Sequence, residues 1–161
     1  SNILIIQGGY SGKKFIYDRL NELGVNVTIM DGPDSIWRTE AEKGNIAEFI
    51  PLDFTDNETV FSRAMEAIED DAGKFDAITS YFEDAIPLVA RMAAALSLEG
   101  NAVEACEIAR NKRRTRQVMA EHNLPVPKFR SILKEEDVLP ACAFVGFPAI
   151  LKPVFGAASL V

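Results

Sequence analysis

The sequence predicts an α/β fold in which a doubly wound parallel sheet carries helices on both faces. Residues 3–6 form a continuous aliphatic run, which is typical of a strand buried on both sides, and the glycine-rich residues 7–12 end it. Apolar residues then recur at helical spacing over residues 13–23, and a second apolar run covers residues 25–30. A strand, a helix and a strand in this succession predict a right-handed crossover between parallel neighbours.

The alternation of strands and helices continues along the chain. Residues 46–52 and 75–80 predict two further strands, and residues 57–69 predict an amphipathic helix between them. The next helix accepts Pro87 in its first turn, and Asp84 is predicted to cap it. These elements complete one domain.

A helical region and a second strand-forming region follow. Asn101 opens one helix, and Asn111 is predicted to cap its continuation. Residues 124–127 end the helical region, because a residue that precedes a proline disfavours helix. The elements predicted after this turn are a strand over residues 128–132, a short helix over residues 135–142 and a strand over residues 147–152.

The composition indicates a globular chain. Apolar residues make up 48% and charged residues 25% of the 161 residues, which supports a large core. The net charge of -7 argues against broad nucleic-acid binding, since phosphate attraction requires a basic surface. Cys106 and Cys142 have apolar neighbours and no metal-ligand spacing, which predicts two buried, reduced thiols. Because no apolar run approaches the roughly 20 residues that span a bilayer, we expect a cytoplasmic protein without a membrane partner.

The glycine turn after the first strand stands where many α/β folds bind phosphates, but it fits neither common motif. A Walker A loop requires glycine where Gln7 stands and serine or threonine where Lys14 stands. The dinucleotide fingerprint keeps Gly9 and Gly12 but again has Gln7 in place of its first glycine. Asp31 ends the second strand, where an NAD-binding fold places its ribose ligand. A structural turn is favoured, and NAD binding stays open as an alternative.

Other polar side chains have simpler interpretations. Glu83 follows the fourth predicted strand at the carboxyl edge of the sheet, where it could attract a substrate amine, although a solvated carboxylate is the commoner fate. His122 has no nucleophile placed beside it by any motif, which favours a packed or surface histidine. The cationic Arg113, Arg114 and Arg116 are interpreted as a solvated helix face.

The closing residues of the chain combine a strand, a cation and a loop of small residues. The apolar run that begins at Phe147 carries Lys152. The small residues that follow it are Gly156, Ala157, Ala158 and Ser159. Small residues let a phosphate approach the backbone amides closely, and a lysine neutralises its charge. The pattern therefore predicts part of a phosphate site.

Three segments of the chain, taken in order, resemble the ATP-grasp superfamily. They are residues 111–116 (NKRRTR), residues 122–127 (HNLPVP) and residues 146–153 (GFPAILKP). In that family a lysine opens a helix, a "leucine or valine, proline, valine, proline" turn follows, and a later strand carries a second lysine before a small-residue loop. The likeness covers nearly the whole chain, and within the superfamily the chain most resembles the dipeptide-forming branch of L-amino acid ligases and carnosine synthases.

The resemblance implies a domain organisation and a set of site residues. The implied domains are a Rossmann-like amino-terminal domain over residues 1–100, a helical linker over residues 101–127 and the beginning of an ATP-grasp domain over residues 128–161. Lys112 and Lys152 match the two lysines that contact ATP, chiefly at its phosphates. Gly156, Ala157, Ala158 and Ser159 match the flexible loop that closes over the nucleotide.

The function that the resemblance implies is the amino-terminal part of an ATP-dependent carboxylate–amine ligase. Such enzymes work through an acyl phosphate, use ATP and Mg²⁺, and in this branch take amino-acid-like carboxylate and amine substrates. A homo-oligomer is compatible with the sequence. The sequence does not identify catalytic residues.

Two departures from the family pattern bear on these expectations. Ser159, Leu160 and Val161 lack the glycine with which the family loop often continues. The adenine hinge, the acidic metal ligands and the substrate-binding arginines are expected beyond residue 161, so the 161-residue piece alone is expected to be inactive. The alternatives that stay open are a non-catalytic module that binds a small amino compound near Glu83, and the NAD-binding domain considered above.

Overall fold

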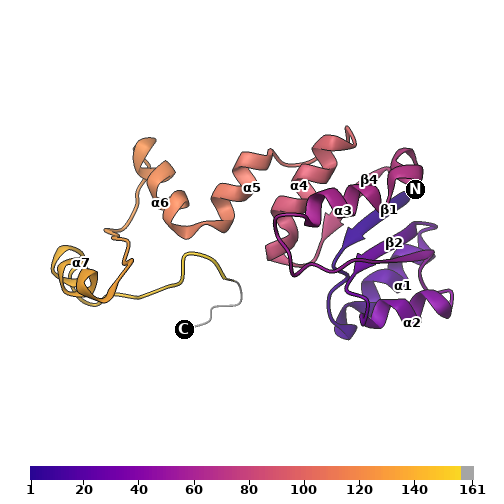
Figure 1. Ribbon diagram of the computed structural model, residues 1–161, viewed down its shortest axis with the longest axis horizontal. Coiled ribbons are helices and arrows are strands. Elements are labelled where there is room, and N and C mark those ends of the chain that lie inside the picture. Colours follow the sequence, from indigo (N-terminus) through magenta and orange to yellow (C-terminus); the bar gives the residue numbers. More distant parts are fainter. Residues whose placement is uncertain (157–161) are drawn as a thin grey trace. The chain divides into compact units, whose positions relative to one another are not determined.

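A computed structural model describes residues 1–156 of the chain (Figure 1). The chain divides into two compact units, a first unit over Ser1–Cys106 and a second unit over Glu107–Val161. Each unit has its own secondary structure, and they are described separately below.

The first unit contains a four-stranded parallel sheet. Its strands are β1 (Asn2–Ile6), β2 (Asn26–Asp31), β3 (Glu48–Pro51) and β4 (Ala77–Ser80). They lie in the order β3-β2-β1-β4, so β1 is an interior strand that pairs with both β2 and β4. Ile5, for example, is in register with Ile29 of β2 and Thr79 of β4. The predicted α/β class with a parallel sheet is confirmed.

Helices cover both faces of this sheet, as Figure 1 shows. They are α1 (Lys14–Glu22), α2 (Ile36–Glu42), α3 (Val60–Glu66) and α4 (Ile86–Ala95). Successive residues of a strand point to opposite faces, so Leu4 and Ile6 join the core beneath α3 and α4, whereas Ile5 joins the core beneath α1 and α2. Leu4, Ile5 and Ile6 are fully buried, which explains why their run contains no polar residue.

The core beneath α1 and α2 is built around two aromatic residues. The rings of Tyr17 in α1 and Trp37 in α2 lie 4.2 Å apart, and each side chain is 1% exposed. The Tyr17 hydroxyl donates to the Gly8 carbonyl at 2.6 Å, and the Trp37 indole N–H donates to the Gly9 carbonyl at 2.7 Å. A buried aromatic residue with a polar tip is stable only when that tip finds such a partner.

Two predictions about the helices of the first unit require correction. A 3-10 turn over Glu83–Ala85 precedes α4, so Asp84 lies inside that turn and Ala85 occupies the N-cap position of the helix. Pro87 lies in the first turn of α4, as predicted. The amphipathic helix predicted over residues 57–69 is shorter, because α3 covers only Val60–Glu66 and a 3-10 helix begins at Glu69.

The described part of the second unit is helical and irregular. Helix α5 (Val103–Arg110) begins before the boundary between the units, and α6 (Lys112–Glu121) and α7 (Val138–Val145) follow it. The strands predicted over residues 128–132 and 147–152 are not formed. A strand requires a neighbour to complete its ladder of backbone hydrogen bonds, and no segment of the second unit up to residue 156 supplies one. Their apolar side chains are correspondingly open to solvent, with Phe147 80% and Leu151 76% exposed.

The prediction for the two cysteines holds in part. Both thiols are free, and Cys106 is buried, but Cys142 is only half-buried. Among the residues that the structure describes, no helix is both long and apolar enough to span a bilayer.

Tyr17 is expected to give the first unit a pH dependence under alkaline conditions. Burial raises the pKa of the Tyr17 phenol above its ordinary value of 10.0, and the nearby Tyr81 and Asp31 add to the shift. The unfolded chain therefore loses this proton first, so the stability is fully present below about pH 10 and falls as the pH rises above it, by about 1.4 kcal/mol per pH unit. Urea unfolding at pH 8 and pH 11 measures this loss.

Tyr17→Phe is the comparison for this measurement. The variant lacks the ionisable group, so its free energy of unfolding should fall less between the two pH values than that of the wild type. Equal losses in the two proteins would contradict the assignment of the alkaline dependence to Tyr17.

Candidate functional site

The first candidate region is the carboxyl edge of the parallel sheet. From β1 the chain proceeds to β2 and β3 on one side, and β4 pairs with β1 on the other side. The point between β1 and β4 is thus a topological switch point, and open α/β sheets bind ligands outside the carboxyl ends of the strands at such points. The glycine loop after β1 and the turn that contains Glu83 after β4 flank it.

The glycine loop is held in place by side chains from α1, β2 and α2. The Gly8 N–H donates to the Asp31 carboxylate at 3.1 Å, and the carbonyls of Gly8 and Gly9 accept from Tyr17 and Trp37 as described above. A Cβ atom at Gly8 would lie 2.6 Å from the Trp37 ring, so only glycine fits there. Gly8 and Gly9 therefore have the close packing of a structural turn, which is the interpretation that the sequence favoured.

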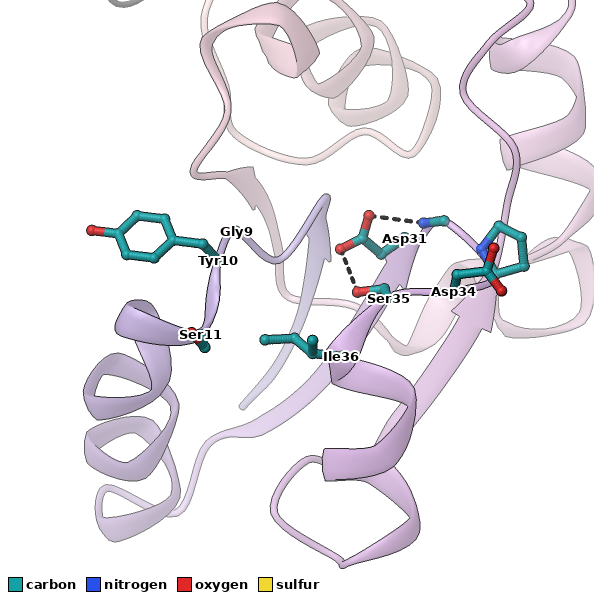
Figure 2. Close-up of a pocket in the computed structure, with 9 residues that line it drawn as sticks. Gly9, Tyr10, Ser11, Asp31, Asp34, Ser35 and Ile36 are labelled. Atoms are coloured by element: carbon teal, nitrogen blue, oxygen red, sulfur yellow. Dashed lines mark hydrogen bonds between the residues drawn. The ribbon is translucent and has the colours of Figure 1, made fainter.

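The Asp31 carboxylate stabilises the loops after β1 and β2 in this region. One carboxylate oxygen accepts from the Gly32 N–H at 2.8 Å, and the other accepts from the Ser35 hydroxyl at 2.9 Å (Figure 2). The second oxygen also accepts from the Gly8 N–H. Both oxygens that an NAD ribose would engage thus already hold the loops after β1 and β2 together. This arrangement supports the structural interpretation of the glycine turn over NAD binding.

An open groove of about 600 Å³ lies between the two loops. It is lined by Gly9, Tyr10, Ser11 and the residues from Asp31 to Ile36 (Figure 2). Nearby, the Lys13 ammonium lies 5.2 Å from the centre of the Tyr81 ring and 5.9 Å from that of Tyr10, which are cation–π distances. Glu83 lies in the 3-10 turn after β4, and its role toward a substrate amine stays a prediction.

The second candidate region brings Lys112 against the segment that follows Lys152. The Lys112 backbone N–H donates to the Val154 carbonyl at 3.1 Å, and its ammonium group donates to the Gly156 carbonyl at 3.0 Å. These residues are up to 44 positions apart in the sequence. Lys152 itself is exposed and stands two residues before Val154. The side chains of both lysines are thus exposed, and only Lys112 makes a described contact with the segment that follows Lys152.

The start of α6 is fixed by two neighbours of Lys112. The Asn111 side chain accepts from the Arg114 N–H at 2.9 Å, which confirms it as the N-cap. The Thr115 hydroxyl lies within hydrogen-bond distance of the carbonyls of Ile108, at 2.7 Å, and Asn111, at 3.1 Å, so it ties the end of α5 to the start of α6. Sequence reasoning did not identify Thr115, although a hydroxyl four residues after an N-cap is placed to reach back in this way.

The remaining predicted residues fall into two groups. Ala157, Ala158 and Ser159 lie outside the described residues, so their predicted role stays a prediction. His122 is exposed at the end of α6, and Arg114 pairs with Glu121 at 3.1 Å on the surface of the same helix. The exposure of His122 agrees with the surface alternative of its prediction, and the position of Arg114 agrees with the predicted solvated helix face. Such surface pairs contribute little to stability.

The donor groups of the second region suit an anion. Lysine ammonium groups and backbone amides bind phosphate oxygens and do not bind Mg²⁺, which prefers carboxylate oxygens and water. Within residues 1–156, no group of three or more His, Cys, Asp or Glu side chains is placed to hold a metal ion. The chemistry of these donor groups therefore suits the phosphates of a nucleotide.

Removal of the Asn111 cap is expected to loosen the start of α6. Asn111→Ala leaves the Arg114 N–H without its acceptor, at a cost of about 1 kcal/mol, which corresponds to roughly fivefold faster amide exchange at Arg114. Hydrogen exchange followed by NMR measures this rate. Asn111→Asp keeps an acceptor in the same place and should exchange like the wild type, and an unchanged rate in Asn111→Ala would show that the cap does not hold α6.

The chain is similar to known proteins in sequence and in fold. The family described as the ATP-grasp N-terminal domain matches residues 17–100. Carnosine synthase 1 of Gallus gallus is 27% identical over 169 aligned positions, which cover 99% of this chain and 18% of that protein.

Two solved structures share the fold. The L-amino acid ligase from Bacillus licheniformis is 25% identical, with a TM-score of 0.69, over 97% of this chain and 38% of that one. The N5-carboxyaminoimidazole synthetase from Staphylococcus aureus, complexed with ADP, is 21% identical, with a TM-score of 0.67, over 98% of this chain and 39% of that one.

These comparisons define both the family and the extent of the match. The chain spans less than a fifth of the carnosine synthase and under two fifths of each solved structure. The family match covers just over half of the chain and includes β2, β3, β4 and the helices between them. The chain belongs to the ATP-grasp family, of which it represents an amino-terminal portion.

Proposed function

We propose that this chain forms the amino-terminal part of an ATP-dependent carboxylate–amine ligase that joins amino acids into dipeptides. The observation that supports the proposal is the pair of hydrogen bonds from Lys112 to Val154 and Gly156, which joins the first predicted lysine to the segment that follows Lys152. The relatives support the substrate class, since they include a carnosine synthase and an L-amino acid ligase. The solved relative complexed with ADP supports the nucleotide.

The proposed chemistry explains why cations are required. A carboxylate is a poor acylating agent, so one of its oxygens first attacks the terminal phosphorus of ATP, and ADP leaves. The amine then attacks the acyl carbon, loses a proton and expels phosphate. Negative charge gathers on the phosphate oxygens in the first step, and positioned cations stabilise it.

Each predicted site residue has a place in this scheme. Lys112 and Lys152 neutralise the phosphates, and Gly156 with the small residues Ala157, Ala158 and Ser159 lets the backbone amides approach them. Glu83 attracts the substrate amine at the carboxyl edge of the sheet. When bound, Mg²⁺ would neutralise charge on the phosphates, and the cationic Lys112 and Lys152 would not be among its ligands. The proposed enzyme acts in the cytoplasm, without a nucleic acid or membrane partner. A homo-oligomer is compatible with it.

The proposed domains follow the same scheme. Residues 1–100 form the domain that precedes the ATP-grasp domain, residues 101–127 form a linker that carries the first lysine, and residues 128–161 begin the ATP-grasp domain. The structural division at Cys106 and Glu107 falls within the proposed linker.

ADP release tests the proposed function. A polypeptide that begins with this chain and continues to the length of its relatives should release ADP in the presence of ATP, Mg²⁺ and pairs of amino acids. Omission of either amino acid should suppress dipeptide formation. Absence of amino-acid-dependent ADP release across the twenty common amino acids would contradict dipeptide ligation, and calorimetry with NAD in parallel would detect the alternative ligand.

A further inference from the structure

Lys13 is a half-buried cation at the carboxyl edge of the sheet. It ends the 3-10 turn Ser11–Lys13 that follows the glycine loop, and its backbone N–H donates to the Tyr10 carbonyl at 2.9 Å. A Cβ atom at Gly9 would lie 3.1 Å from Cγ of Lys13, so the lysine stem packs directly over that glycine. The φ of Gly9 is +85°, a conformation that favours glycine and so keeps this surface open for the stem.

Two aromatic rings from different loops lie near the Lys13 ammonium group. The centre of the Tyr81 ring, directly after β4, is 5.2 Å away, and that of the Tyr10 ring, in the loop after β1, is 5.9 Å away. These two loops flank the switch point between β1 and β4. The Tyr81 ring has a neighbour of its own, because it meets the Tyr17 ring edge-on with 6.1 Å between the ring centres. The ammonium group is therefore held at the switch point by contacts from both loops.

These contacts leave the N–H donors of Lys13 available to a ligand. The ion pairs that the structure describes within residues 1–156 do not include Lys13, whereas the next residue, Lys14, pairs with Asp18. An aromatic face attracts a cation but is a weak hydrogen-bond acceptor, so the three donors of the ammonium group can still bind an anion. Such an anion gains charge-assisted hydrogen bonds, and a stem that is already packed loses little rotamer entropy on binding.

We propose that Lys13 binds a carboxylate group of the substrate, with Tyr10 and Tyr81 as its aromatic supports. The proposal rests on the proposed function, because it takes the anion to be a carboxylate of an amino-acid substrate. In that function Lys112 and Lys152 supply the positive charge for phosphoryl transfer, which leaves Lys13 for a carboxylate that does not react. This group is either the α-carboxylate of the amino acid that provides the amine or a side-chain carboxylate. Lys13 thus selects the substrate and takes no part in the chemical step.

NMR titrations of the 161-residue chain with two matched pairs of ligands test this assignment. L-Alanine and L-alaninamide differ in the α-carboxylate, whereas L-glutamate and L-glutamine differ in the side-chain carboxylate. The amide signals of Gly9 and Tyr81 report binding, and inorganic phosphate serves as a probe for a different anion. Lys13→Met removes the ammonium group and keeps an unbranched stem. Lys14→Met is the matched control, because Lys14 carries the same charge but is exposed and paired with Asp18.

The expected result is that the acid of one pair binds about tenfold more tightly than its amide. This preference disappears in Lys13→Met, persists in Lys14→Met and is retained in Lys13→Arg, which keeps the charge. The pair that shows the preference identifies the carboxylate that Lys13 binds. Tyr10→Leu removes an exposed ring and should weaken the binding of that acid about threefold, whereas Tyr10→Phe keeps the ring and should bind like the wild type.

Three outcomes overturn the assignment to Lys13. They are the absence of a preference in the wild type for either acid, a preference that survives Lys13→Met, and tighter binding of inorganic phosphate than of the preferred acid. If Lys13→Met does not fold, the two Tyr10 variants decide, and equal affinities of Tyr10→Leu and Tyr10→Phe overturn the assignment.

ADP release by the longer polypeptide separates this inference from the proposed function. Amino-acid-dependent ADP release without a carboxylate preference overturns only the role of Lys13. A carboxylate preference that depends on Lys13, without ADP release, overturns dipeptide ligation and leaves the carboxylate site standing.

Discussion

Lys152→Ala is expected to reduce the rate of ADP release by the longer polypeptide about a hundredfold or more. The lysine is exposed and stands two residues before Val154, which Lys112 holds, and in the proposed function its ammonium group neutralises charge on the phosphate oxygens. Removal of one group that stabilises transition-state charge typically lowers kcat by roughly 10²–10³-fold. Steady-state ADP release with saturating ATP and amino acids measures the effect.

Two further variants make this prediction specific. Lys128→Ala removes an equally exposed lysine of the second unit and should leave turnover within about twofold of the wild type. Lys152→Arg keeps the charge and should retain more turnover than the alanine variant. Unchanged turnover in Lys152→Ala would refute the role of this lysine.

Trp37→Ala is expected to destabilise the first unit by about 3–5 kcal/mol. The indole is 1% exposed, contacts the Tyr17 ring and donates to the Gly9 carbonyl, so its removal leaves both a cavity and an unsatisfied acceptor. The loss is comparable to the whole stability of many small domains. Urea unfolding followed by circular dichroism measures it.

Phe15→Ala is the control for this prediction. Phe15 belongs to the neighbouring helix α1 but is 70% exposed, so its removal should change the free energy of unfolding by no more than about 0.5 kcal/mol. Similar losses in the two variants would show that Trp37 does not organise the core beneath α1 and α2.

The sheet of the first unit could be predicted because its signals are local. The aliphatic run at residues 3–6 and the helical spacing after it depend only on neighbours in the sequence, and the Asn111 cap depends on a residue three positions away. Helix α2 was not predicted because it is only seven residues long and its Ser35 cap follows a proline-containing turn. Its main contribution, the contact of Trp37 with the glycine loop, depends on residues 28 positions apart.

In the second unit, by contrast, two of the predicted elements do not form. Residues 128–132 and 147–152 have the apolar composition of strands, but a strand also needs a partner that composition does not reveal. Lys152 is predicted from the apolar run and the small residues around it, whereas Lys112 comes from the family resemblance. The contact of Lys112 with Gly156 could not be derived from spacing alone. Sequence reasoning missed Thr115 because its hydrogen bonds join the end of α5 to the start of α6, and no sequence motif marks such a contact.

The interior position of β1 has a consequence for synthesis of the chain. Its second neighbour, β4, ends only at Ser80, and the Asn2 N–H finds its acceptor in Asp76, 74 residues later. Until the ribosome has released β4, one side of the Ile3–Ile6 run is an unpaired, uncharged edge that can pair with another nascent chain. Truncated polypeptides that stop before residue 80 should therefore aggregate, and those that include β4 and α4 should remain in solution.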